Sequence, residues 1–208
     1  YGGARCDWLD LSTGINPIPY PLPEIPDHFW YTLPDSGAQA DLLNAARNFW
    51  NVPQSAGIIA TSGVSQLIGW DVGEAGSVRV VVHPNNPDGR THDITISDVQ
   101  KSALTIIDES FCDIIPSQTL IALAKQPNVI ILKGLGKFWG LAGMRLGFAI
   151  ASPNLIQRII DVVGPWAISG PAQYIGRAAL MDTTWVTDTR ERLAVDARRL
   201  DTLMSQHA

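Results

Sequence analysis

Short, nearly uninterrupted apolar runs are the feature that most constrains the fold of this chain. They cover residues 57–60, 78–82, 104–107, 129–132 and 147–152. Runs of this length rich in Val, Ile and Leu are typical of strands buried on both faces, as in a parallel sheet covered by helices. We therefore predict an α/β fold with a mainly parallel sheet and helices on both faces.

Segments with helical spacing of apolar residues lie between and after these runs. Residues 35–50 show this spacing behind Asp35 or Ser36 as a cap, and residues 154–163 form a short amphipathic pattern. Residues 172–207 are predicted to form one long helix, whose charged positions we interpret as a solvated face. These charged positions are Arg190, Glu191, Arg192, Arg198 and Arg199.

Prolines set the first segment apart from the rest. Six of them fall within residues 1–34. Because proline fixes φ and biases the preceding residue away from the helical region, we predict an extended N-terminal arm over 1–34. The remaining chain divides into a large domain over 35–165 and the long helix of 166–208.

Composition excludes several classes of protein. The chain has 208 residues, 46% of them apolar, and a formal net charge of −5 with scattered basic residues, which argues against a nucleic-acid partner. No apolar run is long enough to span a membrane and the first residues do not form a signal peptide, so we expect a cytoplasmic protein with no membrane partner. Cys6 and Cys112 have no nearby Cys or His at metal-ligand spacing, so we predict free thiols and no metal site.

The stretch 131–148, Ile-Leu-Lys-Gly-Leu-Gly-Lys-Phe-Trp-Gly-Leu-Ala-Gly-Met-Arg-Leu-Gly-Phe, carries the strongest indication of chemistry. Lys137 lies at its centre among glycines, which let the backbone approach a bound group closely. The apolar neighbours Phe138 and Trp139 are expected to disfavour the charged form of this lysine. Both features suit a lysine that binds a carbonyl compound covalently.

This stretch resembles the cofactor-lysine motif of fold-type I pyridoxal-phosphate enzymes, in which Ser-x-x-Lys precedes a glycine-rich turn and an arginine. The resemblance implies the large domain of an aspartate aminotransferase-like fold, with pyridoxal 5'-phosphate bound to Lys137 and its phosphate held by Arg145. The chain departs from the motif at Gly134, which occupies the place of a serine whose hydroxyl normally bonds the phosphate.

Three further motifs follow the order of the same superfamily. Residues 61–68, Thr-Ser-Gly-Val-Ser-Gln-Leu-Ile, form a small-residue turn before a helix, and we propose residues 63–65 (Gly63, Val64 and Ser65) as a phosphate cup. Residues 83–90, His-Pro-Asn-Asn-Pro-Asp-Gly-Arg, resemble an Asn-Pro-x-Gly motif in which Asn86 would donate to the cofactor's phenolic oxygen. Asp108 ends an apolar run and would pair with the pyridinium nitrogen, whereas Glu109 is interpreted as structural.

The arm resembles the start of threonine-phosphate decarboxylases of cobalamin biosynthesis. The match covers residues 8–21, Trp-Leu-Asp-Leu-Ser-Thr-Gly-Ile-Asn-Pro-Ile-Pro-Tyr-Pro, and it implies that Asn16 and the backbone of Gly2 and Gly3 meet the substrate. Phe111 suits this group, whereas the histidinol-phosphate type usually carries tyrosine there. The resemblance implies decarboxylation of L-threonine O-3-phosphate to (R)-1-amino-2-propanol phosphate, in a homodimer with Lys137 and Asp108 as catalytic residues.

Two alternatives remain open at this point. The first is an aminotransferase of the histidinol-phosphate type that uses the same residues. The second is a shortened, catalytically inactive remnant, because the ring-stacking section of the family is missing near 69–77 and the small C-terminal domain is largely absent from the chain. Trp70 is the nearby aromatic residue that could replace the missing ring.

Overall fold

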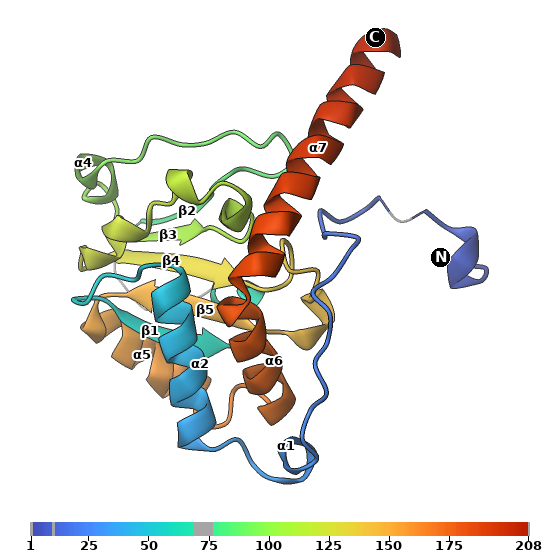
Figure 1. The fold of residues 1–208 in the computed structure, drawn as a ribbon. Helices are drawn as coiled ribbons and strands as arrows, with labels where there is room; N and C mark the ends of the chain where they lie inside the picture. Colours follow the sequence, from blue (N-terminus) through green and yellow to red (C-terminus); the bar gives the residue numbers. More distant parts are fainter. Residues whose placement is uncertain (1, 10, 69–76, 208) are drawn as a thin grey trace.

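A single mixed sheet forms the centre of the computed structural model, which describes residues 2–9, 11–68 and 77–207 (Figure 1). Trp70 and the shortened section around it lie outside these described residues. The sheet has five strands in the order β1-β5-β4-β3-β2. Their bounds are β1 Gly57–Thr61, β2 Val78–Val82, β3 Leu104–Asp108, β4 Val129–Gly134 and β5 Gly147–Ala151.

Strand direction brings the predicted site residues together at the carboxyl ends of the parallel strands. β2, β3 and β4 are parallel neighbours, and their register places Val82 beside Asp108 and Asp108 beside Leu132. β5 runs antiparallel to both β4 and β1, so it alone of the five strands is reversed. The prediction of a mainly parallel α/β sheet is therefore confirmed, and the reversal of β5 places the lysine stretch in the turn at the carboxyl end of β4.

Side-chain alternation along the strands builds a core on each face of the sheet. On β3, Ile106 enters a core that contains Leu155, Ile156 and Ile159 of α5, whereas Ile107 enters the core on the opposite face. Helices α2 and α6 cover that opposite face and pack against each other (Figure 1). Helices on both faces explain why the strand sequences are apolar throughout.

The helices near the sheet follow their sequence signals closely. Asp35 caps α2, because its carboxylate accepts a hydrogen bond of 2.8 Å from the backbone N–H of Ala38. The α-helices are α1 His28–Tyr31, α2 Ser36–Phe49, α3 Ser65–Ile68, α4 Ile96–Val99, α5 Pro153–Val163, α6 Gly170–Met181 and α7 Thr183–His207. Short 3-10 turns are η1 Arg5–Asp7, η2 Cys112–Ile114, η3 Pro116–Gln118, η4 Ile121–Lys125 and η5 Ala142–Met144.

The prediction of one long helix over 172–207 is wrong. Asp182 leaves the helical region, with φ −86° and ψ 78°, and separates α6 from α7. Its carboxylate then accepts a hydrogen bond of 2.9 Å from the backbone N–H of Trp185, which satisfies a free donor at the start of α7. As a result α6 belongs to the helical layer on the sheet, while α7 extends beyond it (Figure 1).

The N-terminal arm is extended as predicted, apart from η1 and α1. Two backbone hydrogen bonds fix it to the lysine stretch, from Asn16 N to Lys137 O at 3.0 Å and from Tyr20 N to Trp139 O at 2.9 Å. Within the described ranges, the chain has no helix with the length and apolar character needed to cross a membrane.

Candidate active site

Lys137 lies in the turn between β4 and β5, where three segments meet. Its side chain is partly buried, and its Nζ lies 5.3 Å from the centroid of the Phe111 ring. Trp139, which is fully buried, anchors the turn in the core. The arm covers the turn through Asn16, so the lysine has a defined position between the sheet and the arm.

The predicted phosphate cup and its arginine come together in space. Arg145 adopts a left-handed conformation with φ 53°, and its Nη2 donates to Ser65 Oγ at 3.1 Å. Gly63 has φ +83°, and a Cβ at this position would lie 2.5 Å from Arg145 Nη2. The absence of a side chain at residue 63 therefore allows the guanidinium to approach the loop before α3.

A cavity of about 200 Å³ lies at this junction. Its lining contains Lys137 and Arg145 but no carboxylate, so its charged groups are positive. The lining residues are Gly63, Val64, Ser65, Ser110, Gly134, Gly136, Lys137, Leu141, Ala142, Arg145 and Leu146. We use the name phosphate cup, first given to residues 63–65, for this whole cavity. Guanidinium, ammonium and hydroxyl groups are the donors that bind phosphate in proteins.

Gly134 leaves space in the phosphate cup where the family motif has a serine. A Cβ there would lie 3.3 Å from Val64 Cγ1 and 3.8 Å from Ser110 Oγ. The hydroxyl of Ser110 therefore lies close to the place of the missing one. Ser110 was not among the predicted site residues, because its proximity to Gly134 arises only from the pairing of β3 with β4 and leaves no signal in the sequence.

Asp108 lies where predicted, at the carboxyl end of β3, and is 7% exposed. Its Oδ1 accepts hydrogen bonds from Ser110 N at 2.9 Å and from Ser110 Oγ at 2.5 Å. Asp108 does not line the phosphate cup itself, but Ser110 connects it to the lining. Its predicted pairing with a pyridinium nitrogen stays a prediction.

A second cavity of about 420 Å³ also has Lys137 in its lining and contains the predicted site residues Asn16 and Asn86. We call it the substrate cavity. Its lining residues are Gly14, Ile15, Asn16, Pro17, Pro84, Asn85, Asn86, Pro87, Gly89, Phe111, Ile114, Ile115, Lys137, Phe138 and Leu193. Lys137 lines both cavities, so a ligand bound to it would have space on either side.

The structure does not bring Gly2 and Gly3 to either cavity. Both are exposed, and the carbonyl oxygen of Gly2 accepts a hydrogen bond of 2.8 Å from Trp8 Nε1. The N-terminal end of the arm lies away from the sheet in this single chain (Figure 1). The predicted contact of these glycines with a substrate phosphate therefore stays a prediction.

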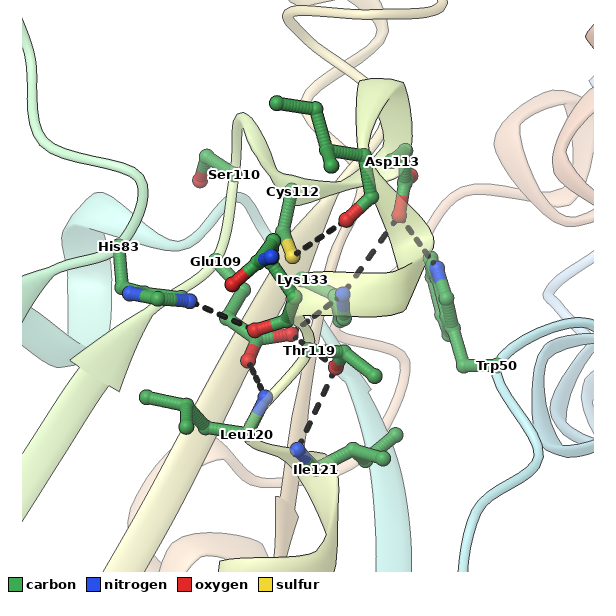
Figure 2. Close-up of polar contacts among 12 residues, drawn as sticks. Trp50, His83, Glu109, Ser110, Cys112, Asp113, Thr119, Leu120, Ile121 and Lys133 are labelled. Carbon is green, nitrogen blue, oxygen red and sulfur yellow. Dashed lines mark hydrogen bonds and ion pairs between the residues drawn. The ribbon is translucent and has the colours of Figure 1, made fainter. Parts of the chain in front are cut away.

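Glu109 belongs to a buried cluster of charged residues. The cluster also contains Lys133, which was not predicted from the sequence. Figure 2 shows Lys133 between Glu109 and Asp113, with Nζ–O distances of 2.5 and 3.6 Å. Burial alone would lower the pKa of Lys133, but the carboxylates of Asp113 and Glu109 raise it above its ordinary value. Glu109 also accepts from Thr119 Oγ1 and Leu120 N, so its interpretation as structural agrees with its contacts.

His83, Glu109 and Cys112 place ligand-type atoms within 4.8 Å of one another, but hydrogen bonds already occupy these atoms. The imidazole of His83 accepts from His92 N at 3.0 Å and donates from Nε2 to the carbonyl of Gln118 at 2.7 Å. Burial, with a contribution from Glu109, raises the pKa of the Cys112 thiol to about 12. The hydrogen bonds of His83 and Cys112 give this cluster a structural role between the segments that follow β2 and β3.

Arg190 and Arg192 depart from the predicted solvated face of the last helix. Both are partly buried, whereas Glu191, Arg198 and Arg199 are exposed as predicted. The Nε of Arg190 donates to the carbonyl of Asp113 at 2.7 Å, and Nη2 of Arg192 donates to Asn16 Oδ1 at 2.8 Å. The start of α7 therefore docks beside the lysine stretch.

The fold and the two cavities define an α/β enzyme in which a lysine lies between a phosphate-sized cup and a larger substrate cavity. Residues 71–207 match the family model described as aminotransferase class I and II. The chain therefore belongs to this family, and the predicted fold class is confirmed.

Two relatives share sequence over most of their length with this chain. The threonine-phosphate decarboxylase of Pseudomonas aeruginosa is 32% identical, over 97% of this chain and 73% of that protein. The threonine-phosphate decarboxylase of a Sinorhizobium species is 34% identical, over 88% of this chain and 69% of that protein. A histidinol-phosphate aminotransferase of a Nostoc species is 27% identical, over 95% of this chain and 59% of that protein. The family resemblance found in the sequence is therefore confirmed.

Solved structures agree on the fold. The histidinol-phosphate aminotransferase from Clostridium acetobutylicum superposes with a TM-score of 0.76 at 18% identity, covering 96% of this chain and 77% of that one. The histidinol-phosphate aminotransferase from Sinorhizobium meliloti, solved in complex with pyridoxal-5'-phosphate, gives a TM-score of 0.69 at 19% identity, covering 82% of this chain and 62% of that one. At these identities the superpositions show the fold alone, and the cofactor prediction is confirmed by the family to which the chain belongs.

The residues of this chain fit the cofactor of the family. The side chain missing at Gly63 allows Arg145 and Ser65 to meet, and the resulting phosphate cup is positively charged. Lys137 lines the same space and would hold the cofactor covalently. Gly134 removes one phosphate donor from this set, and Ser110 places another hydroxyl nearby.

Proposed function

We propose that this protein is a pyridoxal-phosphate-dependent decarboxylase that converts L-threonine O-3-phosphate to (R)-1-amino-2-propanol phosphate, as in cobalamin biosynthesis. The observation that carries the proposal is the match to two relatives named threonine-phosphate decarboxylase, of which this chain covers 73% and 69%. The arm supports it, since Asn16 of the decarboxylase-like start lines the cavity next to Lys137.

The reaction sets clear demands on the residues of the site. The bond between Cα and the carboxylate breaks, carbon dioxide leaves, and a proton replaces it on Cα. Pyridoxal phosphate, when bound, supplies the electron sink for the electron pair left on Cα. The protein must orient the breaking bond and deliver one proton.

Three residues of the site have candidate roles in this reaction. Lys137 lines both cavities and, when it is not bonded to the cofactor, would be the group that delivers the proton to Cα. Asp108, which Ser110 holds by two hydrogen bonds, would keep a nitrogen of the bound ring protonated. Phe111 covers Lys137 and offers no ionisable group of its own, which limits competing proton transfer at that side.

The proposal is tested first by absorbance and then by product. The purified protein with added pyridoxal phosphate should show a long-wavelength band that borohydride removes and that Lys137→Ala lacks. The loaded protein should then release carbon dioxide from L-threonine O-3-phosphate. A loaded protein that releases no carbon dioxide would contradict the decarboxylase proposal.

The aminotransferase alternative is supported by the relative from Nostoc, which is 27% identical to this chain. It predicts transfer of the amino group from histidinol phosphate to 2-oxoglutarate. Finding this transfer without carbon dioxide release would replace the first proposal with the second.

Gly134 is the observation that favours the inactive alternative, and it offers a direct test. Gly134→Ser would add a donor to the phosphate cup, where the Cβ meets only Val64 Cγ1 at 3.3 Å as a close contact. A hydrogen bond to a charged group contributes about 1.5–3 kcal/mol, so we expect cofactor binding at least several-fold tighter than in the native protein. If neither protein binds the cofactor at millimolar concentration, the remnant interpretation holds.

A further inference from the structure

Arg192 on α7 contacts a residue that lines the substrate cavity. Its Nη2 donates to Oδ1 of Asn16 at 2.8 Å, a contact between residues 176 positions apart in the chain. Asn16 is 7% exposed and lines the cavity together with Leu193, the next residue on α7. The arm, the lysine turn and α7 therefore converge at one amide group.

The hydrogen bonds of Asn16 determine which end of its amide serves the cavity. Its Oδ1 accepts from both Arg192 and Ile18 N, the latter at 3.1 Å, and its Nδ2 donates to Phe138 O at 2.8 Å. An amide nitrogen carries two hydrogens, and the bond to Phe138 uses one of them. The carbonyl end is thus held away by donors, and the donor end remains available to a ligand.

The charges around the substrate cavity show why an anionic ligand would need the pair formed by Asn16 and Arg192. Lys137 is the one charged residue in the lining of the substrate cavity, and the proposed cofactor would occupy it. Arg90 lies near the rim beside Gly89, but it is exposed and paired with Asp88 at 2.9 Å. The side chain of Arg192 is 27% exposed, and its carboxylate neighbour Asp196 lies 3.4 Å away and is 57% exposed. Arg192 therefore adds a positive charge, partly offset by Asp196, at a residue that lines the cavity.

We propose that Arg192 is a positioning residue for substrate recognition, which orients Asn16 and supplies the positive charge that holds an anionic group of the substrate in this cavity. The anionic group is a carboxylate or a phosphate, the two groups of an O-phosphorylated amino acid. The inference deepens the proposed function and rests on it for the identity of the substrate.

The test compares three variants of the full chain loaded with pyridoxal phosphate. Arg192→Gln retains a side-chain donor but removes the charge, Arg192→Lys retains the charge, and Arg199→Gln removes an exposed charge further along the same helix. We expect Arg192→Gln to raise KM for L-threonine O-3-phosphate on the order of 10- to 100-fold, with kcat changed much less. Arg192→Lys should recover most of this loss, and Arg199→Gln should match the native protein.

A purely structural role of Arg192 gives a different pattern. If Arg192 only ties α7 to the arm, Gln and Lys should lower thermal stability alike, and KM should not follow the charge. Equal KM values for the native protein and Arg192→Gln would overturn the inference. The native affinity should also weaken with added potassium chloride, and this dependence should be smaller in Arg192→Gln.

Binding of three probes separates the two possible anions and the two proposals. L-threonine carries only the carboxylate, 1-amino-2-propanol phosphate only the phosphate, and O-phospho-L-threonine both. The probe whose affinity falls in Arg192→Gln identifies the anion that Arg192 serves. Probe binding without turnover would contradict the proposed function while still deciding the role of Arg192, and turnover that is insensitive to Arg192→Gln would do the reverse.

Discussion

The guanidinium of Arg145 reaches Ser65 across a position where a side chain has no space. A Cβ on Gly63 would lie 2.5 Å from Arg145 Nη2, and the backbone there has φ +83°. We expect Gly63→Ala to displace Arg145 and weaken cofactor binding at least tenfold, in addition to about 1–3 kcal/mol of backbone strain. Fluorescence titration with pyridoxal phosphate measures the first effect and thermal unfolding the second.

Gly164→Ala is the matched control for this prediction. Gly164 also has a positive φ, +72°, but nothing lies within 4 Å of its would-be Cβ. It should therefore show the strain without the loss of cofactor affinity. Equal cofactor affinity in the two variants would contradict the role of Gly63 in placing Arg145.

The two cysteines should differ sharply in reactivity. Cys6 is exposed, whereas Cys112 is buried and its pKa is raised from 9.0 to about 12 by burial and, to a lesser extent, by Glu109. Because the thiolate is the reactive form, one thiol should react with a disulfide reagent at mildly alkaline pH in the folded protein, and two after unfolding. Rapid reaction of both thiols in the folded protein would contradict the buried position of Cys112.

At the scale of elements, Asp182 combines two tasks at the junction of α6 and α7. It caps α7 by accepting from Trp185 N, and it contributes, after burial, to the raised pKa of Tyr20 in the arm. We expect Asp182→Ala to destabilise the protein by about 0.5–2 kcal/mol through the lost cap. Denaturant unfolding at neutral pH measures this loss, and Asp182→Asn, which keeps an acceptor, should recover most of it.

The effect of Asp182 on Tyr20 also predicts how the stability of the protein changes with pH. A group whose pKa is raised by folding contributes stability that is complete below its ordinary pKa and is lost as the pH rises through the folded pKa. For Tyr20 the ordinary value is 10.0, so the native protein should lose stability above pH 10. This loss should be smaller in Asp182→Ala, and an equal slope in both proteins would show that Asp182 does not act on Tyr20.

At the scale of the whole molecule, Lys133 links the sheet to the segments that cover it. It lies on β4, pairs with Glu109 and Asp113, and stands 5.9 Å from the ring centroid of Trp50 at the end of α2. Lys133→Met would leave two carboxylates buried without their cation. Removing one partner from a buried ion pair typically costs about 3–5 kcal/mol, which we expect to see in the free energy of unfolding.

Lys101→Met provides the control for this prediction. Lys101 also makes a short ion pair, of 2.8 Å with Asp98, but its side chain is 69% exposed. An exposed pair contributes about 0–1 kcal/mol, so this variant should unfold close to the native protein. Similar losses in the two variants would show that burial does not control the strength of the Lys133 cluster.

The elements that local patterns specify were predicted well. The strands, α2 with its Asp35 cap and α5 all follow from apolar spacing and capping residues near one another in the chain. The break at Asp182 was missed, because a single residue leaving the helical region hardly alters the apolar spacing. The role of Lys133 was missed for a related reason. One charged residue within an apolar run does not indicate that carboxylates pair with it in the core.

The sequence by itself determined the α/β class, the order of the strands and helices, and the lysine motif with Arg145 eight residues later, because these depend on neighbours along the chain. Only the tertiary structure decided that Ser110 lies beside Gly134, that carboxylates compensate the charge of Lys133 in the core, and that Arg192 contacts Asn16. These contacts depend on strand register and on where the arm and α7 return to the sheet. Such long-range geometry is set by the packing of the whole molecule and leaves no periodic signal in the sequence.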